Sequence, residues 1–246
     1  MCGRYSSTRG PGDLAAEFEA EWEASADAGP DHAADVEAPN PSYNVAPTDT
    51  VYTVRVRHSS AARVLEPMRW GLIPSWADDV TVGSRMFNAR AETLTTSGAF
   101  KKAAAVRRCL VPADGWYEWA KRPDSPKKQA YYLTRPAGVA LAGVYEFWKA
   151  PKTDAWVVSC SIITVASAGE LAEIHDRMPL ALPDERWTTW LDPGMPDPTP
   201  MLDPSAELLR SLEIRPVGSA VGNVANNGLD LQRPDKPAAD TPATLF

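Results

Sequence analysis

The residue with the most distinctive chemistry in this sequence is the cysteine at position 2, directly after the first methionine. Removal of Met1 is expected because the next residue is small. The exposed α-amine would have a pKa of about 8, so a sizeable fraction is neutral and nucleophilic near neutral pH. Such an amine forms an imine with an aldehyde, and the adjacent thiol closes on it to give a thiazolidine ring, helped by proximity. The alternative is that Cys2 is a small, inert residue.

Polar side chains alternate in the segment FNARAET, residues 87–93. Asn88, Arg90 and Glu92 would point the same way from an extended chain, which makes them candidates for one polar site. The alternative is the polar edge of a loop before a helix, with Glu92 in the first helical turn.

Glu118 lies within the aromatic run GWYEW. Alternation along a strand places Trp116 on the same face as Glu118, and Tyr117 and Trp119 on the other face. A carboxyl group in such surroundings is expected to be desolvated, which raises its pKa toward the range useful for a general acid or base. The other interpretation is a rim carboxylate paired with a nearby base such as Lys121.

His175 ends a predicted short helix, AGELAEIH, and is followed by Asp176 and Arg177. This group could transfer protons, or His175 could cap the carbonyl end of the helix. The remaining histidines, His32 and His58, lie in an acidic loop and at a strand end. No spacing resembles a metal site, so neither a metal nor another cofactor is expected.

Bulky apolar side chains gather in MRWGLIPSWA, residues 68–77. Gly71 and Pro74 exclude a simple core helix for this segment. On a loop, Trp70 and Trp76 could stack on nucleic-acid bases or wedge between them. The alternative is packing in the core.

The net charge of −7 is unevenly distributed. Residues 13–37 hold nine of the 32 carboxylates and no lysine or arginine, which leaves 23 acids against 25 bases in the rest of the chain. A phosphate-binding surface on that remainder is compatible with the charge, because local patches steer a polyanion.

The apolar pattern predicts one α+β domain with a β-rich, mainly antiparallel sheet or barrel core and a few short peripheral helices. Strands are expected at 51–57, where Arg55 and Arg57 form a basic face, and at 63–70, where Pro67 favours an edge or bulge. Runs at 109–119, 130–134, 139–148 and 156–166 complete the core. A helix from Asp13 places Leu14, Phe18 and Trp22 on one apolar stripe.

The domain is expected to span residues 1–232, with an acidic loop at about 25–41 and a disordered tail at 233–246. No apolar run reaches the roughly 18–20 residues of a membrane helix, and the amino terminus lacks a secretory signal. The three cysteines are far apart in the sequence, which argues against a disulfide framework. A cytoplasmic location is expected.

Seven motifs occur in a fixed order: MCGR, YNVAPT, MRWGLIPSW, FNARAET, RRCLVPADGWYEW, HDRMP and VGNVANN. Together they resemble the SOS response-associated peptidase family, the SRAP domain, from Cys2 to about Asn227. The resemblance implies a DNA damage function: the protein would bind single-stranded DNA containing abasic sites and capture the ring-opened sugar in a thiazolidine crosslink that shields the lesion. The protein is expected to be a monomer without membrane contact, associated with the nucleoid when bound to DNA.

The resemblance also implies roles for individual residues. Cys2 supplies the amine and the thiol, and Asn88 positions that amine. Glu118 shuttles protons during imine formation and assists removal of Met1, while His175 helps to open the sugar.

Contacts to the DNA follow from the same resemblance. Arg4, Arg90 and Arg177 match phosphate contacts beside the lesion. Trp70 matches the apolar element packed against the neighbouring bases.

Three functions are therefore compared. The first is crosslinking of abasic DNA by Cys2, with self-processing peptidase activity at the Met1–Cys2 bond and weak lyase activity from an imine that does not close. The second is a cysteine peptidase for other proteins, with His175 as base and Asn88 as orienting residue. The third is a non-catalytic reader of single strands or modified bases.

Overall fold

A computed structural model describes residues 2–23, 38–57, 60–123 and 125–235 of the chain. Most of the predicted acidic loop, residues 25–37, and most of the predicted tail, residues 236–246, lie outside these described residues. The described residues form one mixed sheet of twelve strands. The strands are β1 (Tyr5–Ser7), β2 (Glu21–Trp22), β3 (Ser42–Val45), β4 (Thr50–Val56), β5 (Arg63–Trp70), β6 (Asn88–Arg90), β7 (Arg108–Arg122), β8 (Ser125–Lys149), β9 (Trp156–Ala166), β10 (Arg177–Pro179), β11 (Ala181–Leu182) and β12 (Glu213–Val217).

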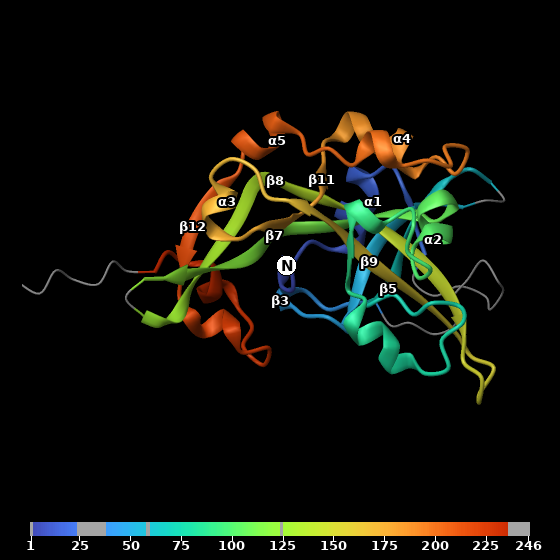
Figure 1. Ribbon diagram of the computed structural model, residues 1–246, viewed down its shortest axis with the longest axis horizontal. Helices are drawn as coiled ribbons and strands as arrows, with labels where there is room; N and C mark the ends of the chain where they lie inside the picture. The colour runs from blue at the N-terminus through green and yellow to red at the C-terminus, as the bar shows by residue number, and fades with distance from the viewer. Residues whose placement is uncertain (1, 24–37, 58–59, 124, 236–246) are drawn as a thin grey trace, which may run out of the picture.

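Short helices surround this sheet, and Figure 1 shows α4 and α5 along its upper edge. None of the described helices is long and apolar enough to cross a membrane. The α-helices are α1 (Pro11–Glu17), α2 (Lys101–Val106), α3 (Leu171–Ile174), α4 (Trp187–Leu191) and α5 (Ala206–Arg210). The 3-10 helices are η1 (Val80–Arg85), η2 (Ala91–Thr93), η3 (Asp184–Arg186), η4 (Thr199–Met201), η5 (Ser219–Gly222) and η6 (Leu229–Gln232).

The sheet closes on itself as a barrel. Strand β8 pairs with both β7 and β9, and the path from β9 through β5 and β4 leads back to β7. Most of the pairings are antiparallel, whereas β5 and β6 run parallel to β9 and β2 runs parallel to β5. The predicted α+β class with a mainly antiparallel sheet or barrel core is therefore confirmed.

Strands covered on both faces supply much of the buried core of the barrel. In β9, the apolar and small residues of the segment 158–165 are all buried, as expected for a strand covered on both faces. The tryptophans Trp70, Trp116 and Trp190 are fully buried and are among the largest side chains in the core. The runs predicted separately at 130–134 and 139–148 belong to the single long strand β8.

The predicted helix from Asp13 to Trp22 is wrong in its length. Helix α1 is capped by Gly10 rather than Asp13, and Glu19 has a positive φ of 50° just after the helix ends. Leu14 and Phe18 are buried as predicted, but Trp22 lies in β2 and pairs with β5. Pairing with a distant strand therefore prevails over the local helical pattern.

The two predictions for the β4–β5 pair have different outcomes. Pro67 lies in the gap between the β5 residues that pair with β2 and those that pair with β9, so on this side it has no pairing strand among the described residues, as expected for a residue without an N–H. The predicted basic face of β4 is wrong because Arg55 is buried, 1% exposed. Its guanidinium binds the Glu66 carboxylate through Nε at 2.5 Å and through a second nitrogen at 3.2 Å, and lies over the Tyr145 ring.

Removing one partner of this buried pair should strongly destabilise the fold. Glu66→Ala leaves the Arg55 charge desolvated without its carboxylate, and we expect the free energy of unfolding to fall by about 3–5 kcal/mol. The double variant Arg55→Met with Glu66→Leu should lose much less, since no unpaired charge remains. Urea unfolding of the three proteins measures this difference, and a loss below about 1 kcal/mol in Glu66→Ala would contradict it.

Candidate active site

The amino-terminal segment is held inside the protein by backbone pairing. Strand β1 pairs with β7 at Tyr5 and Trp116, and the Tyr117 N–H donates to the Arg4 carbonyl at 2.9 Å. Continued toward the chain start, this pairing brings Cys2 to the part of β7 that carries Glu118. The Cys2 side chain is fully buried there, and the segment lies near the centre of the molecule in Figure 1.

Asn88 fixes the same segment from another strand. Its Nδ2 donates a hydrogen bond of 2.7 Å to the Cys2 carbonyl oxygen. Strand β6 presents Asn88 in this direction because it pairs with β9 and turns Ala89 into the core. The Asn88 Oδ1 atom is buried and has no hydrogen-bond partner among the described residues, so an acceptor remains available beside Cys2.

Glu118 is a desolvated carboxyl group, as its aromatic neighbours predict. It is 3% exposed, and burial raises its pKa to about 7. Burial also raises the pKa of the Cys2 thiol well above its usual range, and the Glu118 charge adds to this rise. The Arg4 backbone N–H bonds the thiol and acts in the opposite direction. Thiol and carboxyl therefore lie close enough to influence each other.

His175 caps α3 and faces the same region. Its Nδ1 accepts the Arg177 backbone N–H at 3.0 Å and lies 2.9 Å from an Asp176 carboxylate oxygen. Burial lowers the pKa of His175, so the ring is neutral near pH 7. The Asp176 charge raises the pKa of both His175 and Glu118, although burial is the larger influence on each. His175 and Glu118 thus share one electrostatic environment.

The four side chains come from four separate elements: the segment before β1, β6, β7 and the end of α3. The structure brings Cys2, Asn88 and Glu118 together and places His175 beside them. This arrangement combines a nucleophile, an amide, a carboxyl that titrates near neutral pH and a neutral imidazole, which are the groups needed to move protons at a carbonyl carbon.

The three arginines predicted to bind phosphate differ in their availability. Arg90 is exposed, and its side chain makes no ion pair or hydrogen bond within the described part of the chain. Arg4 donates to Asn44 Oδ1 at 3.0 Å and to the Val221 carbonyl at 2.9 Å, which ties β1 to η5. Arg177 forms a bidentate pair with Glu92, at 2.5 and 2.9 Å, so a phosphate there would have to compete with a carboxylate.

The predicted contact of Trp70 with bases is wrong, because the ring is fully buried. Its Nε1 donates to the Phe87 carbonyl at 2.9 Å, and Tyr5 packs edge-on at 5.2 Å. Trp76, six residues later in the same motif, is 62% exposed. The two tryptophans could be told apart by their positions in the motif. Trp70 is the last residue of strand β5, whereas Trp76 follows Pro74 in the loop.

Two glycines fix the base of the Trp76 loop. Gly71 has a φ of 128°, and a Cβ built on it would lie 2.6 Å from the Gly83 carbonyl oxygen. A Cβ on Gly83 would in turn lie 2.5 Å from the Gly71 carbonyl oxygen. The backbones therefore touch directly, and a side chain at either position would push them apart.

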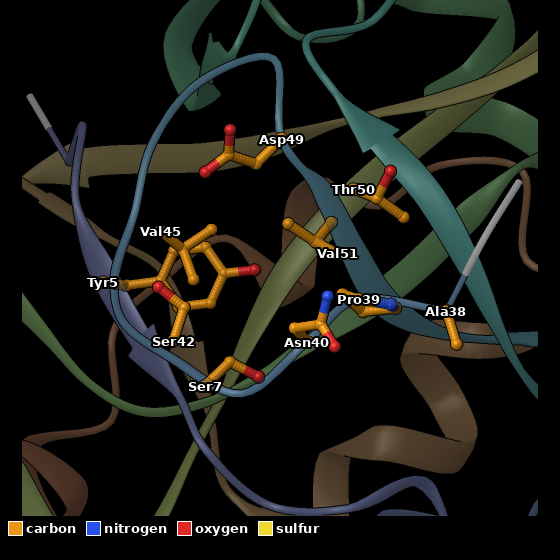
Figure 2. A pocket seen from close by; sticks show the side chains of 10 residues that line it. All are labelled: Tyr5, Ser7, Ala38, Pro39, Asn40, Ser42, Val45, Asp49, Thr50 and Val51. Carbon is orange, nitrogen blue, oxygen red and sulfur yellow. The ribbon is translucent and has the colours of Figure 1, made fainter. Parts of the chain in front are cut away.

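A separate cavity of about 290 Å³ lies between β1, β3 and β4 (Figure 2). Asp49 is the charged residue on its wall, and one carboxylate oxygen accepts the Ala46 N–H at 2.9 Å. None of the four clustered side chains lines it, and no base does so among the described residues. An acidic wall of this kind does not suit a phosphate backbone. Within the same described ranges, no cluster of His, Cys, Asp and Glu could hold a metal ion.

The structure is therefore a closed barrel in which Cys2 is buried beside Asn88 and Glu118. The comparison with protein families identifies the class. The profile of the SOS response associated peptidase (SRAP) family matches residues 1–224, and the chain belongs to this family.

Curated relatives cover most of the chain. The abasic site processing protein YoqW of Bacillus subtilis (strain 168) is 38% identical over 198 residues, which are 78% of this chain and 85% of that protein. YedK of Escherichia coli (strain K12), with the same description, is 30% identical over 95% of this chain and 100% of its own length. HMCES of Xenopus tropicalis, also an abasic site processing protein, is 30% identical over 92% and 76%.

Solved structures show the same fold. A crystal structure of a protein from Bacteroides thetaiotaomicron superposes with a TM-score of 0.79 at 21% identity, covering 96% of this chain and 100% of that one. A phage-related protein from Bordetella bronchiseptica gives a TM-score of 0.64 at 27% identity over 88% and 94%.

The buried Glu118 carboxyl should make stability depend on pH. Its rise in pKa to about 7 corresponds to about 3 kcal/mol at roughly 1.4 kcal/mol per pH unit. Near pH 4 the group is protonated in both folded and unfolded chains and no penalty arises. Above pH 7 the folded wild type carries the full penalty, so Glu118→Gln should be more stable by up to about 3 kcal/mol at pH 8 and equal near pH 4.

Urea unfolding at the two pH values measures this difference. Glu185→Gln, which removes an exposed carboxylate, is the control and should change stability much less. A Glu118→Gln protein that is less stable than wild type at pH 8 would show that the carboxylate is stabilised rather than desolvated.

Proposed function

We propose that this protein processes abasic sites in single-stranded DNA by forming a covalent link between Cys2 and the ring-opened deoxyribose. The observation that carries the proposal is the fixed position of Cys2 beside Asn88 and Glu118. Family membership supports it, since relatives that cover most of the chain are described as abasic site processing proteins.

The first step is hydrolysis of the Met1–Cys2 bond. Water adds across this bond, so that Met1 leaves with a carboxyl group and Cys2 gains a free amine. We include self-processing in the proposal, with Glu118 as the group that takes a proton from the attacking water. Its pKa of about 7 suits this task at neutral pH.

The second step joins the amine to the sugar. The Cys2 nitrogen attacks the C1′ aldehyde, and loss of one water gives an imine. The thiol then adds to the imine carbon, its proton passes to the nitrogen, and a thiazolidine ring closes without any change of oxidation state. Burial keeps the thiol protonated until this point, because its pKa is raised. An imine that fails to close can lose the 3′ phosphate by β-elimination, which is a weak lyase activity.

The neighbouring residues divide the proton transfers. Asn88 Oδ1, which lacks a partner in the described structure, can accept a hydrogen bond from the freed Cys2 amine and orient its lone pair. Glu118 can give a proton to the departing water and take one back from the thiol. Neutral His175 can take the proton of the sugar hydroxyl as the ring opens.

Strand binding is assigned to exposed groups of the predicted motifs. Arg90 is available for a phosphate, and Trp76 offers an exposed ring for stacking on a base. Arg4 combines a partly exposed guanidinium with contacts that hold η5 in place.

Covalent capture should depend on Cys2 and on its free amine. Mature protein mixed with a single-stranded oligonucleotide carrying one abasic site should give a shifted band that survives denaturation. Protein that keeps Met1 should give no band. Cys2→Ala and Cys2→Ser keep the amine but lack the thiol, so each should form only an imine, which gives a band that survives denaturation only after borohydride reduction.

The matched control is Cys109→Ala, which removes a buried thiol elsewhere and should keep the crosslink. Glu118→Gln should slow capture by about 100-fold or more, the range of general acid–base catalysis. Intact mass establishes whether Met1 is absent in each sample. A heat-stable adduct in Cys2→Ala without borohydride would refute the proposal.

The two tryptophans of the 68–77 motif should behave differently. Trp76→Ala should weaken binding of a single strand by about 1–3 kcal/mol, the value of one stacking contact, and leave unfolding within about 0.5 kcal/mol of wild type. Trp70→Ala should instead lower the free energy of unfolding by about 3–5 kcal/mol. Fluorescence anisotropy and urea unfolding separate these effects, and unchanged affinity in Trp76→Ala would exclude stacking.

A further inference from the structure

The tip of the β7–β8 hairpin carries a cluster of exposed bases. Lys121 and Arg122 end β7, and Lys127 and Lys128 lie near the start of β8. All four side chains are exposed, and none forms an ion pair within the described part of the chain. Residues 120–130 hold these four bases and one acid, Asp124. We call these four residues the hairpin cluster.

Many other bases of this acidic protein are neutralised locally. Arg107 pairs with Glu146, Arg177 with Glu92 and Arg215 with Glu213. The hairpin cluster therefore stands out as concentrated positive charge that the described fold does not use. Unpaired charges of one sign on a projecting element create a local field that attracts a polyanion.

The hairpin cluster is continuous with the candidate active site. Strand pairing sets Glu118 opposite Tyr131 and Ala120 opposite Gln129, so the cluster begins just beyond these pairs. At roughly 3.3 Å per residue, Lys121 lies about 10 Å along β7 from Glu118. The pKa of His175, lowered mainly by burial, is lowered further by the charge of Lys128. Figure 1 shows the hairpin extending outward from the centre, where the amino-terminal segment lies.

The stem holds the cluster in a defined position. Below the tip, β8 pairs with β12 from Ala130 to Thr134 on one side and with β7 on the other. Lys127 and Lys128 lie just beyond this stem, which is supported on both sides, so the stem fixes where the cluster projects from the sheet.

We propose that the hairpin cluster is a second phosphate-binding surface, which holds the backbone of the single strand a short distance to one side of the reacting nucleotide. The inference rests on the proposed function, because it places the reacting sugar at Cys2. The competing explanation is that lysine and proline at the hairpin protect a strand end from pairing with other chains. That explanation requires no contribution to DNA binding.

The test compares two double variants that remove the same charge. Lys127→Gln/Lys128→Gln neutralises half of the hairpin cluster. Lys101→Gln/Lys102→Gln neutralises an exposed lysine pair on α2, at the opposite side of the molecule in Figure 1. The probe is a single strand with a tetrahydrofuran abasic analogue, which has no aldehyde and cannot crosslink. Anisotropy gives the binding constant over a range of salt concentrations.

We expect the hairpin variant to lose about 1.4 from the slope of log K against log salt, about 0.7 for each phosphate contact. Near 0.1 M salt, the hairpin variant should therefore bind the strand roughly 5- to 25-fold more weakly than wild type. The α2 variant should keep the wild-type slope. The loss should also require nucleotides on one side of the analogue, and it should disappear when the strand is cut short on that side.

Equal slopes in the two double variants, whether both unchanged or both reduced, would overturn the inference. Crosslinking separates this result from failure of the proposed function. The hairpin variant should reach the wild-type final crosslink yield at saturating abasic strand after long incubation, since Cys2, which forms the link, is unchanged; its rate is not compared, because the Lys128 charge also influences His175. If wild type forms no crosslink, the proposed function fails, whereas an unchanged slope with normal crosslinking removes only the second surface.

Discussion

The hydrogen bond from Asn88 to the Cys2 carbonyl, together with the pairing of β1 and β7, holds a chain end inside the protein. Chain ends are usually mobile and solvated, so a reactive group placed there would have no fixed geometry. In this protein the barrel supplies both walls of the site, β7 carrying Glu118 and β6 carrying Asn88. The rest of the arrangement depends on this constraint, because each acid–base group is positioned relative to Cys2.

Desolvation then sets the chemistry of these groups. The same burial raises the pKa of Glu118 and of the Cys2 thiol and lowers the pKa of His175, so thiol and imidazole are neutral near pH 7 and Glu118, with a pKa of about 7, is about half protonated. A carboxyl in this state can give or take a proton at little cost. Elsewhere in the barrel, the buried guanidinium of Arg55 stays charged because the Glu66 carboxylate binds it at two nitrogens. A buried group can therefore either be neutral or be paired with the opposite charge.

The sequence allowed prediction of the features that depend on local pattern. Alternation located β4, its expected partner was β5, and a run rich in β-branched and aromatic residues located β9, each within about a residue. The aromatic surroundings of Glu118 indicated its desolvation. Features that depend on distant partners could not be predicted from the local pattern. Trp22 lies in β2 because this segment pairs with β5, and Arg55 is buried because it pairs with Glu66. The grouping of the four site residues came from the family resemblance, since no spacing connects elements so far apart in the chain. Trp70 was misassigned because its motif spans both a strand and a loop.

The backbone contact between Gly71 and Gly83 makes the intervening loop a closed unit. Its ends are fixed by main-chain atoms, so the exposed side chains between them, Trp76 included, contribute little to where the loop leaves the barrel. Substitutions among these exposed side chains can therefore leave the Cys2 environment unchanged. Under the proposed function, contacts with neighbouring bases through this loop and reactivity at Cys2 would be adjusted independently of each other.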